Sequence, residues 1–445
     1  MIKQKIKLFL IIPAALLLSF FFFINARAYD RVVIVIDPGH GGENLDEGSE
    51  SGAIYREEIL ERDVDLITAT AMRDELLNYP NVSVYMTRED NRAIPLGDRV
   101  DFAKSVDADI MISVHYNASE KHKFYGAEIF TSAFSNYYST GQSAASCIME
   151  KWKEYGLYDK GIKTRIGSSG FDYYGVIRHG VEKDVPVIII EHGYLDNDRD
   201  FERIGNETAW KELGVLDAQG IAAYYGLKKN VMSENIKPTV TKETPEDRVD
   251  PDDTPPSDVS VVIDRYDPAT DSIDYSVYAS EEESGLMYFG VTYDGEVESV
   301  DDEDFNELYL WDPEKEKMEG NLVLPADLAE NLIFRVYNQY CLCTDFEVRK
   351  DVIDIAKQKA LETPVILTEP GPETDSADTE EKSESEVKIT DPAENKNDIN
   401  VKGSITVQNN SSENENMVLY LLIFVLVIIA IVIFFVIIIL IKKML

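Results

Sequence analysis

The sequence is poor in cysteine and in positive charge, and both shortages exclude classes of protein. The chain has 445 residues and only three cysteines, which are too scattered for a disulfide framework or a zinc–cysteine site, so we expect buried free thiols at Cys147, Cys341 and Cys343. Lysine and arginine number 43 against 82 aspartates and glutamates, a formal net charge of −39. This charge would repel phosphates and argues against nucleic acid as a partner.

Much of the acidic excess lies in two segments that also contain few aromatic residues. Residues 243–258 and 369–399 are rich in Glu, Asp, Pro, Ser and Thr. Such segments cannot bury enough apolar surface to compensate for the entropy lost on ordering. We therefore expect an acidic linker over 229–258 and an acidic disordered stalk over 351–416.

An apolar run near the start of the sequence has the pattern of a signal peptide. Lys3, Lys5 and Lys7 precede the run 8–24, and Ala26-Arg27-Ala28 follows it. A basic region, an apolar region and a small-x-small site are the three parts of a secretion signal. The sequence predicts a signal peptide over 1–28 that is cleaved after Ala28, and the alternative is an uncleaved N-terminal anchor.

A second apolar run, over 417–441, predicts a transmembrane helix. It contains no charged residue, and a helix needs about 20 apolar residues to cross ~30 Å of hydrocarbon. Lys442 and Lys443 follow it and favour the inner side of the membrane. We expect a single-pass protein of the cell membrane, with the body of the chain outside.

Residues 30–228 predict one α/β domain, because short β-branched runs alternate with helical patterns. Continuous apolar runs such as VVIVI and VIII indicate strands that are covered on both faces. Strands are expected at 32–36, 82–86, 110–114, 126–130 and 186–190, and helices at 62–79, 95–108 and 208–227. Residues 259–350 differ, since short aromatic-rich runs alternate with acidic turns, and they predict a small all-β module of the sandwich type.

Polar residues that can bind a metal ion or take part in catalysis follow several of these predicted strands. The chain has only five histidines, and IDPGHGG places His40 on a glycine turn after a strand. MISVHYNAS places His115 and VIIIEHGYLDN places Glu191 at the ends of two more strands. REEILERDVDL supplies carboxylates at the start of a helix, namely Glu57, Glu58 and Glu61.

Two histidines and a carboxylate are a common ligand set of catalytic zinc, and a further carboxylate can move the protons of the attacking water. His40, Glu61, His115 and Glu191 fit this scheme. Each residue also has a simpler interpretation: a turn histidine, a helix acid favoured by the macrodipole, a hydrogen-bonded strand-end histidine and a partner of Arg178. Together these interpretations require four coincidences at one edge of one sheet.

The motifs also resemble a known family. VVIVIDPGHGG, ERDVDL, VYMTRED, ADIMISVHYNAS, GAEIF and VPVIIIEHGYLDN occur in the order seen in zinc-dependent N-acetylmuramoyl-L-alanine amidases of the amidase-3 type. The resemblance covers about 30–228 and implies a mixed sheet flanked by helices. ERDVDL corresponds to the family pattern E-K-D-x-N-L. The resemblance implies that Zn²⁺ is bound by His40, Glu61 and His115, and that Glu191 is the catalytic base.

The sequence departs from the family pattern in several places. The loop before Glu61 is longer and more acidic than usual, so Glu58 or Glu57 is an alternative ligand. Tyr194 replaces the usual Phe of the last motif. Residues 160–180 occupy the position of the substrate groove, and Arg178 matches an arginine that follows a leucine on a strand of the family. We expect substrate contacts from Asn117, Arg178 and Arg165, while surface pairing with acids is the alternative for the two arginines.

The resemblance implies hydrolysis of the amide bond between N-acetylmuramic acid and L-alanine in peptidoglycan, by a catalytic domain that faces the cell wall. Two alternatives belong to other classes. One is a wall-binding or scaffold protein that keeps the fold without turnover, and the other is a zinc peptidase that cuts within the stem peptide. A regulatory protein is a further conceivable partner, but no segment of the sequence identifies it.

Overall fold

The computed structural model describes two modules of the chain, an α/β domain and a β module. The description covers 31–42, 51–55, 59–119, 121–230, 243–293, 304–305, 307–326, 328 and 331–362. The expected signal peptide, the expected transmembrane helix and most of the expected stalk lie outside these residues. Among the helices that are described, none combines the length and the apolarity needed to cross a membrane.

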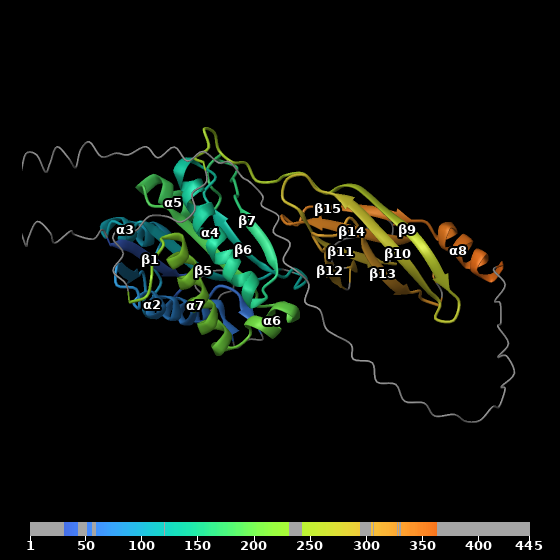
Figure 1. The fold of residues 1–445 in the computed structure, drawn as a ribbon, viewed down its shortest axis with the longest axis horizontal. Coiled ribbons are helices and arrows are strands. Elements are labelled where there is room, and N and C mark those ends of the chain that lie inside the picture. Colours follow the sequence, from blue (N-terminus) through green and yellow to red (C-terminus); the bar gives the residue numbers. More distant parts are fainter. Residues whose placement is uncertain are drawn as a thin grey trace, which may run out of the picture. The chain divides into compact units, whose positions relative to one another are not determined.

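The α/β domain is built on one mixed sheet of six strands (Figure 1). Four strands run parallel to one another, while β6 pairs antiparallel with β8 and parallel with β7. The order across the sheet is β4 (Val82–Met86), β1 (Val32–Pro38), β5 (Ile110–Asn117), β8 (Val187–Tyr194), β6 (Ala127–Thr131) and β7 (Asp159–Lys163). The predicted α/β class and the mixed sheet are confirmed.

Helices cover both faces of this sheet, which explains why the central strands are apolar on every side. One hydrophobic core joins the sheet to α2 (Glu61–Leu76), α4 (Ser135–Tyr155) and α7 (Glu207–Tyr224). A second core on the opposite face involves α3 (Leu96–Ser105) and α5 (Gly175–Lys183). Helix α6 (Asp198–Ile204) follows β8, and α7 packs against both α2 and α4.

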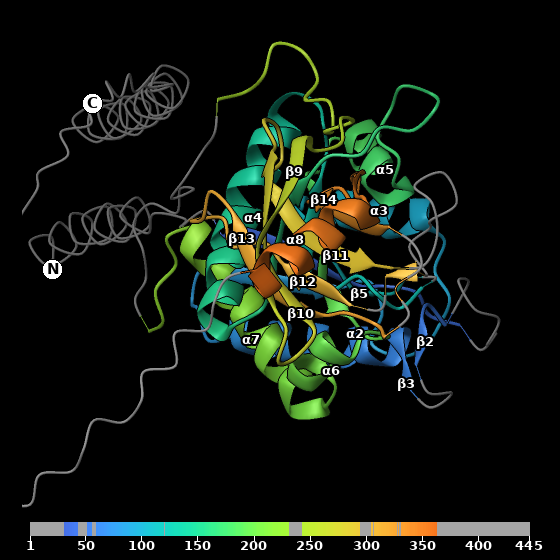
Figure 2. The ribbon, with the colours of Figure 1, turned by 90° about the vertical axis from the view of Figure 1, so that its right-hand side faces the viewer.

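Close packing of α7 on α2 depends on a residue without a side chain. A Cβ on Gly214 would lie 2.1 Å from the backbone oxygen of Thr68, which is far inside van der Waals contact. Gly214 thus lets α7 pack directly on the middle of α2. The short hairpin of β2 (Ile54–Tyr55) and β3 (Ile59–Leu60) lies beside the N-terminal end of α2 (Figure 2).

The β module consists of two antiparallel sheets that share a hydrophobic core. One sheet contains β13 (Met318–Val323), β10 (Ser272–Ser280) and β9 (Ser257–Asp267). The other contains β12 (Leu308–Leu310), β11 (Leu286–Thr292), β14 (Leu332–Asn338) and β15 (Cys343–Val348).

One helix of the β module corrects a prediction. The sequence analysis placed residues 351–362 in an unstructured stalk, and the structure instead has α8 (Lys350–Glu362) there. Ile353 is the physical reason, because its side chain is fully buried in the core of the module. A single buried aliphatic side chain can anchor one face of an otherwise polar helix.

The two modules contact each other through a cluster of aromatic side chains. Phe124, Tyr125 and Tyr158 of the α/β domain pack against Tyr288 and Tyr337 of the β module. The Tyr288 hydroxyl also donates a hydrogen bond to the backbone oxygen of Tyr125. The segment between the modules takes part as well, since the Val249 backbone N–H donates to the Ala133 oxygen at 2.8 Å and the Val249 oxygen accepts from Thr164.

Candidate metal centre and catalytic residues

The loop after β1 carries His40 to the edge of the sheet, and its backbone is held by two buried arginines. His40 has a left-handed backbone, with φ of 52°, which is uncommon for a residue other than glycine. Arg88 donates to the Gly39 oxygen and Arg99 to the His40 oxygen. A Cβ on Gly39 would lie 2.3 Å from the His115 ring, so glycine at this position allows the two histidines to approach.

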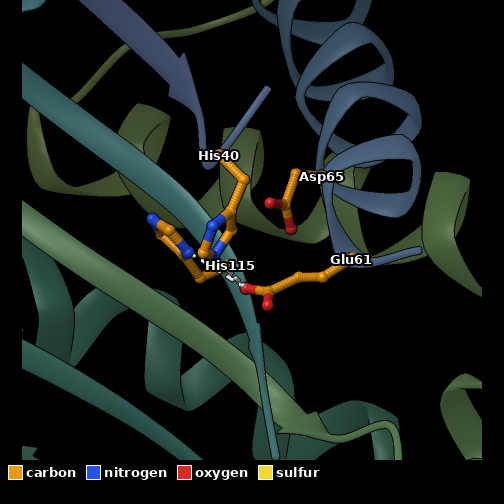
Figure 3. Close-up of side chains that lie close together, drawn as sticks. All are labelled: His40, Glu61, Asp65 and His115. Atoms are coloured by element: carbon orange, nitrogen blue, oxygen red, sulfur yellow. Dashed lines mark hydrogen bonds and ion pairs between the residues drawn. The ribbon is translucent and has the colours of Figure 1, made fainter. Parts of the chain in front are cut away.

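Glu61 is the first residue of α2, and its carboxylate joins the two histidines (Figure 3). Its Oε1 lies 3.1 Å from His40 Nε2 and 3.0 Å from His115 Nδ1. Its Oε2 accepts the backbone N–H of Ala53 at 2.7 Å. Burial opposes ionisation of Glu61, but the neighbouring His40 and His115 outweigh it and hold its pKa far below the usual range.

Asp65 joins this group, although the sequence analysis did not select it. It follows Glu61 by four residues on α2, and residues with this spacing lie on one face of a helix. One potential ligand atom from each of His40, Glu61, Asp65 and His115 lies within 4.8 Å of the others. We call these four residues the histidine–carboxylate cluster. The signal that could have found Asp65 is its spacing from Glu61.

The structure also places Glu191 next to the cluster. Glu191 on β8 is directly opposite His115 on the neighbouring strand β5. Its Oε2 has no hydrogen-bond partner among the described residues. Burial, followed by the negative charges of Glu61 and Glu128, raises the pKa of Glu191 well above the usual value. The carboxyl group is therefore poised to hold or release a proton, depending on the charge beside it.

On its other side Glu191 is opposite Glu128 of β6, a residue that the sequence analysis did not single out. Glu128 is buried with two lysines of β7, since Lys163 pairs with its Oε2 and Lys160 Nζ lies 3.6 Å from its Oε1. Burial opposes ionisation of Glu128, but Lys160 and Lys163 lower its pKa to about 2. We call Glu128, Lys160 and Lys163 the lysine cluster.

The predicted substrate residues are spread around these groups. Asn117 donates from Nδ2 to Glu128 Oε1 at 2.6 Å, so it contacts the lysine cluster. Arg165 is exposed and stacks on Tyr173, with 3.8 Å from Cζ to the ring centre. Arg178 donates to the backbone oxygens of Asp172 and Tyr173. Neither arginine has a contact with the histidine–carboxylate cluster among the described residues.

Two further outcomes concern residues named from the sequence. Arg178 lies on helix α5, so its assignment to a strand was wrong. Helix α5 begins at Gly175 and buries Val176 and Ile177 against the sheet, which fixes Arg178 on the outer part of the helix. Glu57 and Glu58, the alternative ligands, lie outside the described residues.

His192, the residue after Glu191, points away from the cluster and stabilises the sheet from the opposite face. It is fully buried, its Nε2 lies 2.9 Å from Asp217 Oδ2 and its Nδ1 lies 3.1 Å from the backbone oxygen of His115. The ring also stacks on Tyr116. His192 therefore fixes the backbone of β5 at His115 itself.

Comparison with known proteins gives consistent similarities for the α/β domain. Residues 34–223 match the model of a family described as N-acetylmuramoyl-L-alanine amidase. The chain is 31% identical over 206 residues to N-acetylmuramoyl-L-alanine amidase CwlM of Bacillus licheniformis, which covers 45% of this chain and 71% of that protein. It is 26% identical over 226 residues to N-acetylmuramoyl-L-alanine amidase AmiC of Escherichia coli, covering 44% of this chain and about half, 53%, of that protein.

A solved structure is also similar to this chain. It is the catalytic domain of CwlV, an N-acetylmuramoyl-L-alanine amidase from Bacillus (Paenibacillus) polymyxa var. colistinus. The sequence identity is 27% and the TM-score is 0.38, with 44% of this chain and 99% of that structure covered.

Proposed function

The chain belongs to the N-acetylmuramoyl-L-alanine amidase family, and on that premise we propose that it hydrolyses the amide bond between N-acetylmuramic acid and L-alanine in peptidoglycan. The observation that carries the proposal is the convergence of two imidazoles and a carboxylate beside Glu191. These groups come from three separate segments of the chain, and a fold without a bound cation has no need to bring them together.

The donor set of the histidine–carboxylate cluster suits a divalent zinc ion. Nitrogen from two histidines and oxygen from a carboxylate is a usual ligand combination of catalytic zinc, and such sites leave a position for water. The carboxylate of Asp65, buried and without a hydrogen-bond partner among the described residues, also fits a cation. We propose that His40, Glu61 and His115 would hold the ion, which would polarise the substrate carbonyl and lower the pKa of water.

Glu191 would act as the general base and then as the general acid. It lies on the strand next to His115, so its carboxylate is beside the place where substrate and water would meet. It would take the proton of the attacking water and deliver it to the departing nitrogen of L-alanine. Burial, together with the negative charges of Glu61 and Glu128, raises the pKa of Glu191, which would favour the protonated form that the acid step requires.

The substrate would contact the predicted residues around this edge of the sheet. Asn117 is held by Glu128, and its remaining hydrogen-bonding capacity can be used for a carbonyl or a sugar hydroxyl of the substrate. Arg165 is exposed and could contact acidic groups of the stem peptide. Arg178 uses Nη1 for two backbone oxygens, so it would contact substrate through its other nitrogens.

The substrate class places the proposed reaction outside the cytoplasmic membrane, where peptidoglycan lies. The signal peptide over 1–28 and the single span over 417–441 would hold the α/β domain at the cell membrane and facing the wall. Both segments lie outside the described residues, so they remain predictions from the sequence. Fractionation of cells that express the full chain, followed by protease treatment of intact spheroplasts, would test them.

The direct test is mass spectrometry of purified peptidoglycan after incubation with the full chain. The expected products are stem peptides with a free amino terminus on L-alanine. Glu191→Ala should keep its metal and its fold but lose about 10²- to 10⁴-fold in rate, the usual contribution of a general base. Glu89→Ala is a matched control, because Glu89 is an exposed carboxylate that pairs with Arg73 on the surface.

Three outcomes would contradict the proposal. Near-normal cleavage by Glu191→Ala would remove this residue from the chemistry. New amino termini inside the stem peptide would identify a peptidase instead. Binding of peptidoglycan without any cleavage, by a protein that carries its metal, would identify a wall-binding protein.

A further inference from the structure

We propose that Asp65 is a second acidic ligand of the metal site, which thus offers two imidazoles and two carboxylates to one divalent cation. The inference rests on the proposed function only in that a divalent cation binds at this cluster. It goes further because it assigns a role as metal ligand to Asp65, which lies within helix α2 and not at the end of a strand.

The geometry brings Asp65 to the same point as the other three residues. Asp65 and Glu61 are one helical turn apart on α2, and both side chains extend from that helix toward His40 and His115 (Figure 3). A potential ligand atom of Asp65 lies within 4.8 Å of ligand atoms of all three. The side chains could close on a single ion with modest rotations, since ligands of one zinc ion lie about 2 Å from it.

The environment of Asp65 lacks the groups that normally stabilise a buried carboxylate. Its side chain is fully buried, and neither oxygen has a hydrogen-bond partner among the described residues. A buried carboxylate without a partner is strongly unfavourable in a folded protein. A cation in the cluster would supply the missing interaction.

Arg88 and Arg99, the arginines whose charges act on Asp65, do not donate a hydrogen bond to it, because their donors are used elsewhere. Arg88 donates from Nε to the Pro38 oxygen, and its other nitrogens donate to backbone oxygens that include those of Gly39 and Asp90. Arg99 pairs with Asp37 at 2.8 Å and donates to the oxygens of Ile94, Pro38 and His40. Both arginines thus shape the loop of His40 and leave Asp65 without a hydrogen bond.

The charges of the cluster also match a divalent ion. As ligands of a bound cation, the carboxylates of Glu61 and Asp65 and two neutral imidazoles would carry a charge of −2, which one divalent cation would neutralise. An amide in place of Asp65 would leave the loaded site with a net positive charge. Carboxylate oxygens are harder ligands than imidazole nitrogens. A site with two carboxylates therefore favours ions such as Mn²⁺ more than a site made mainly of imidazoles does.

The test measures metal affinity of the full chain by competition with a chelating dye, first for Zn²⁺ and then for Mn²⁺. Asp65→Asn keeps the shape of the side chain and removes its charge. We expect Zn²⁺ affinity to fall about 10- to 100-fold, and Mn²⁺ affinity to fall more, because Mn²⁺ prefers carboxylate oxygen. Asp63→Asn is the matched control, since Asp63 lies on the same turn of α2 and instead accepts from Asn91 at 2.7 Å.

Thermal unfolding of the metal-free protein separates a ligand from a structural residue. Asp65→Asn should leave the metal-free melting temperature unchanged or higher, because neither side-chain oxygen of Asp65 has a hydrogen bond that the substitution would remove. The stabilisation by added Zn²⁺ should be smaller than in the unmodified chain, because the stabilisation follows the affinity.

Each result of these measurements decides one question. Equal Zn²⁺ and Mn²⁺ affinities of Asp65→Asn, Asp63→Asn and the unmodified chain would overturn the inference and leave a protonated, structural Asp65. A lower melting temperature of metal-free Asp65→Asn would likewise show a structural role. An unmodified chain that binds neither ion would instead refute the metal site itself, and with it the proposed function.

Discussion

The two buried charged clusters beside Glu191 differ in where the positive charge that neutralises their carboxylates comes from. Across the sheet, His115 on β5, Glu191 on β8 and Glu128 on β6 are direct neighbours. In the lysine cluster, one carboxylate meets two ammonium groups of the same chain. In the histidine–carboxylate cluster, two carboxylates meet two imidazoles and no lysine or arginine forms an ion pair with them among the described residues.

This difference separates a structural cluster from a site that waits for a ligand. A carboxylate that is fully paired within the chain stabilises one arrangement of strands and binds nothing further. A carboxylate whose oxygens remain without partners obtains its stabilisation from outside the chain. Glu191 lies between the two clusters and responds to both: burial raises its pKa most, the charges of Glu61 and Glu128 raise it further, and Lys160 lowers it.

The largest expected effect follows from removing a ligand of the histidine–carboxylate cluster. His115→Ala should reduce the affinity for Zn²⁺ by about 100-fold or more, because loss of a ligand costs at least as much as loss of a group that supports one. Elemental analysis of the purified full chain measures it, and His40→Ala should behave alike. His122→Ala is the control, since His122 is mostly exposed and pairs with Asp196. Full metal loading of both variants would place the metal elsewhere.

The next largest effect should come from the lysine cluster, and it should concern stability instead of metal. Lys163→Met removes one of the two cations of the buried Glu128 carboxylate, which should lower the free energy of unfolding by about 3 kcal/mol. Lys153→Met is a matched control, because Lys153 pairs with Asp159 on the surface and should cost less than about 1 kcal/mol. Urea unfolding measures both variants.

Metal content of the same variants sharpens the comparison between the clusters. Lys163→Met should retain the metal content of the unmodified chain at neutral pH, because the lysine cluster provides none of the proposed ligands. A loss of metal as large as that of His115→Ala would show that the two clusters act as one unit.

The smallest effect should be a pH dependence of stability that belongs to Glu128. Its pKa falls from 4.5 to about 2 in the folded chain, so its stabilisation is fully present above pH 4.5 and is lost as the pH falls toward 2. The difference in unfolding free energy between the unmodified chain and Glu128→Gln should shrink by about 3 kcal/mol over this interval. A difference that stays constant down to pH 2 would show that Glu128 is not ionised in the folded state.

The sequence predicted those parts of the site that follow apolar strands. His40, His115 and Glu191 each come directly after or within the end of a buried strand, where hydrophobic runs locate both the strand and its end. Glu61 could be placed because a helical pattern begins there. Their separate roles as ligands and base remain proposals, although the structure brings all four residues to one edge of the sheet.

The parts that could not be predicted depend on pairing between distant segments. Strand β7 reads DKGIK, which has no apolar run, and it is recognisable only through its pairing with β6. Glu128 and its lysines therefore gave no signal in the sequence. Helix α4 was missed because its buried face is made largely of small residues such as Ser139, Gly141 and Ala144, which give a weak hydrophobic pattern.

The contact of Lys163 with the β module determines where the chain can be truncated without disturbing the α/β domain. The backbone oxygen of Gln339, in the turn between β14 and β15, accepts a hydrogen bond from Lys163. Truncation after residue 228 would remove that acceptor and uncover the rings of Phe124 and Tyr125. In an isolated catalytic fragment, the Lys163 ammonium group would therefore be exposed to solvent and would keep only one of its two partners. Lys163 lies two strands away from Glu191, so the kinetics of the fragment would differ from those of the whole enzyme.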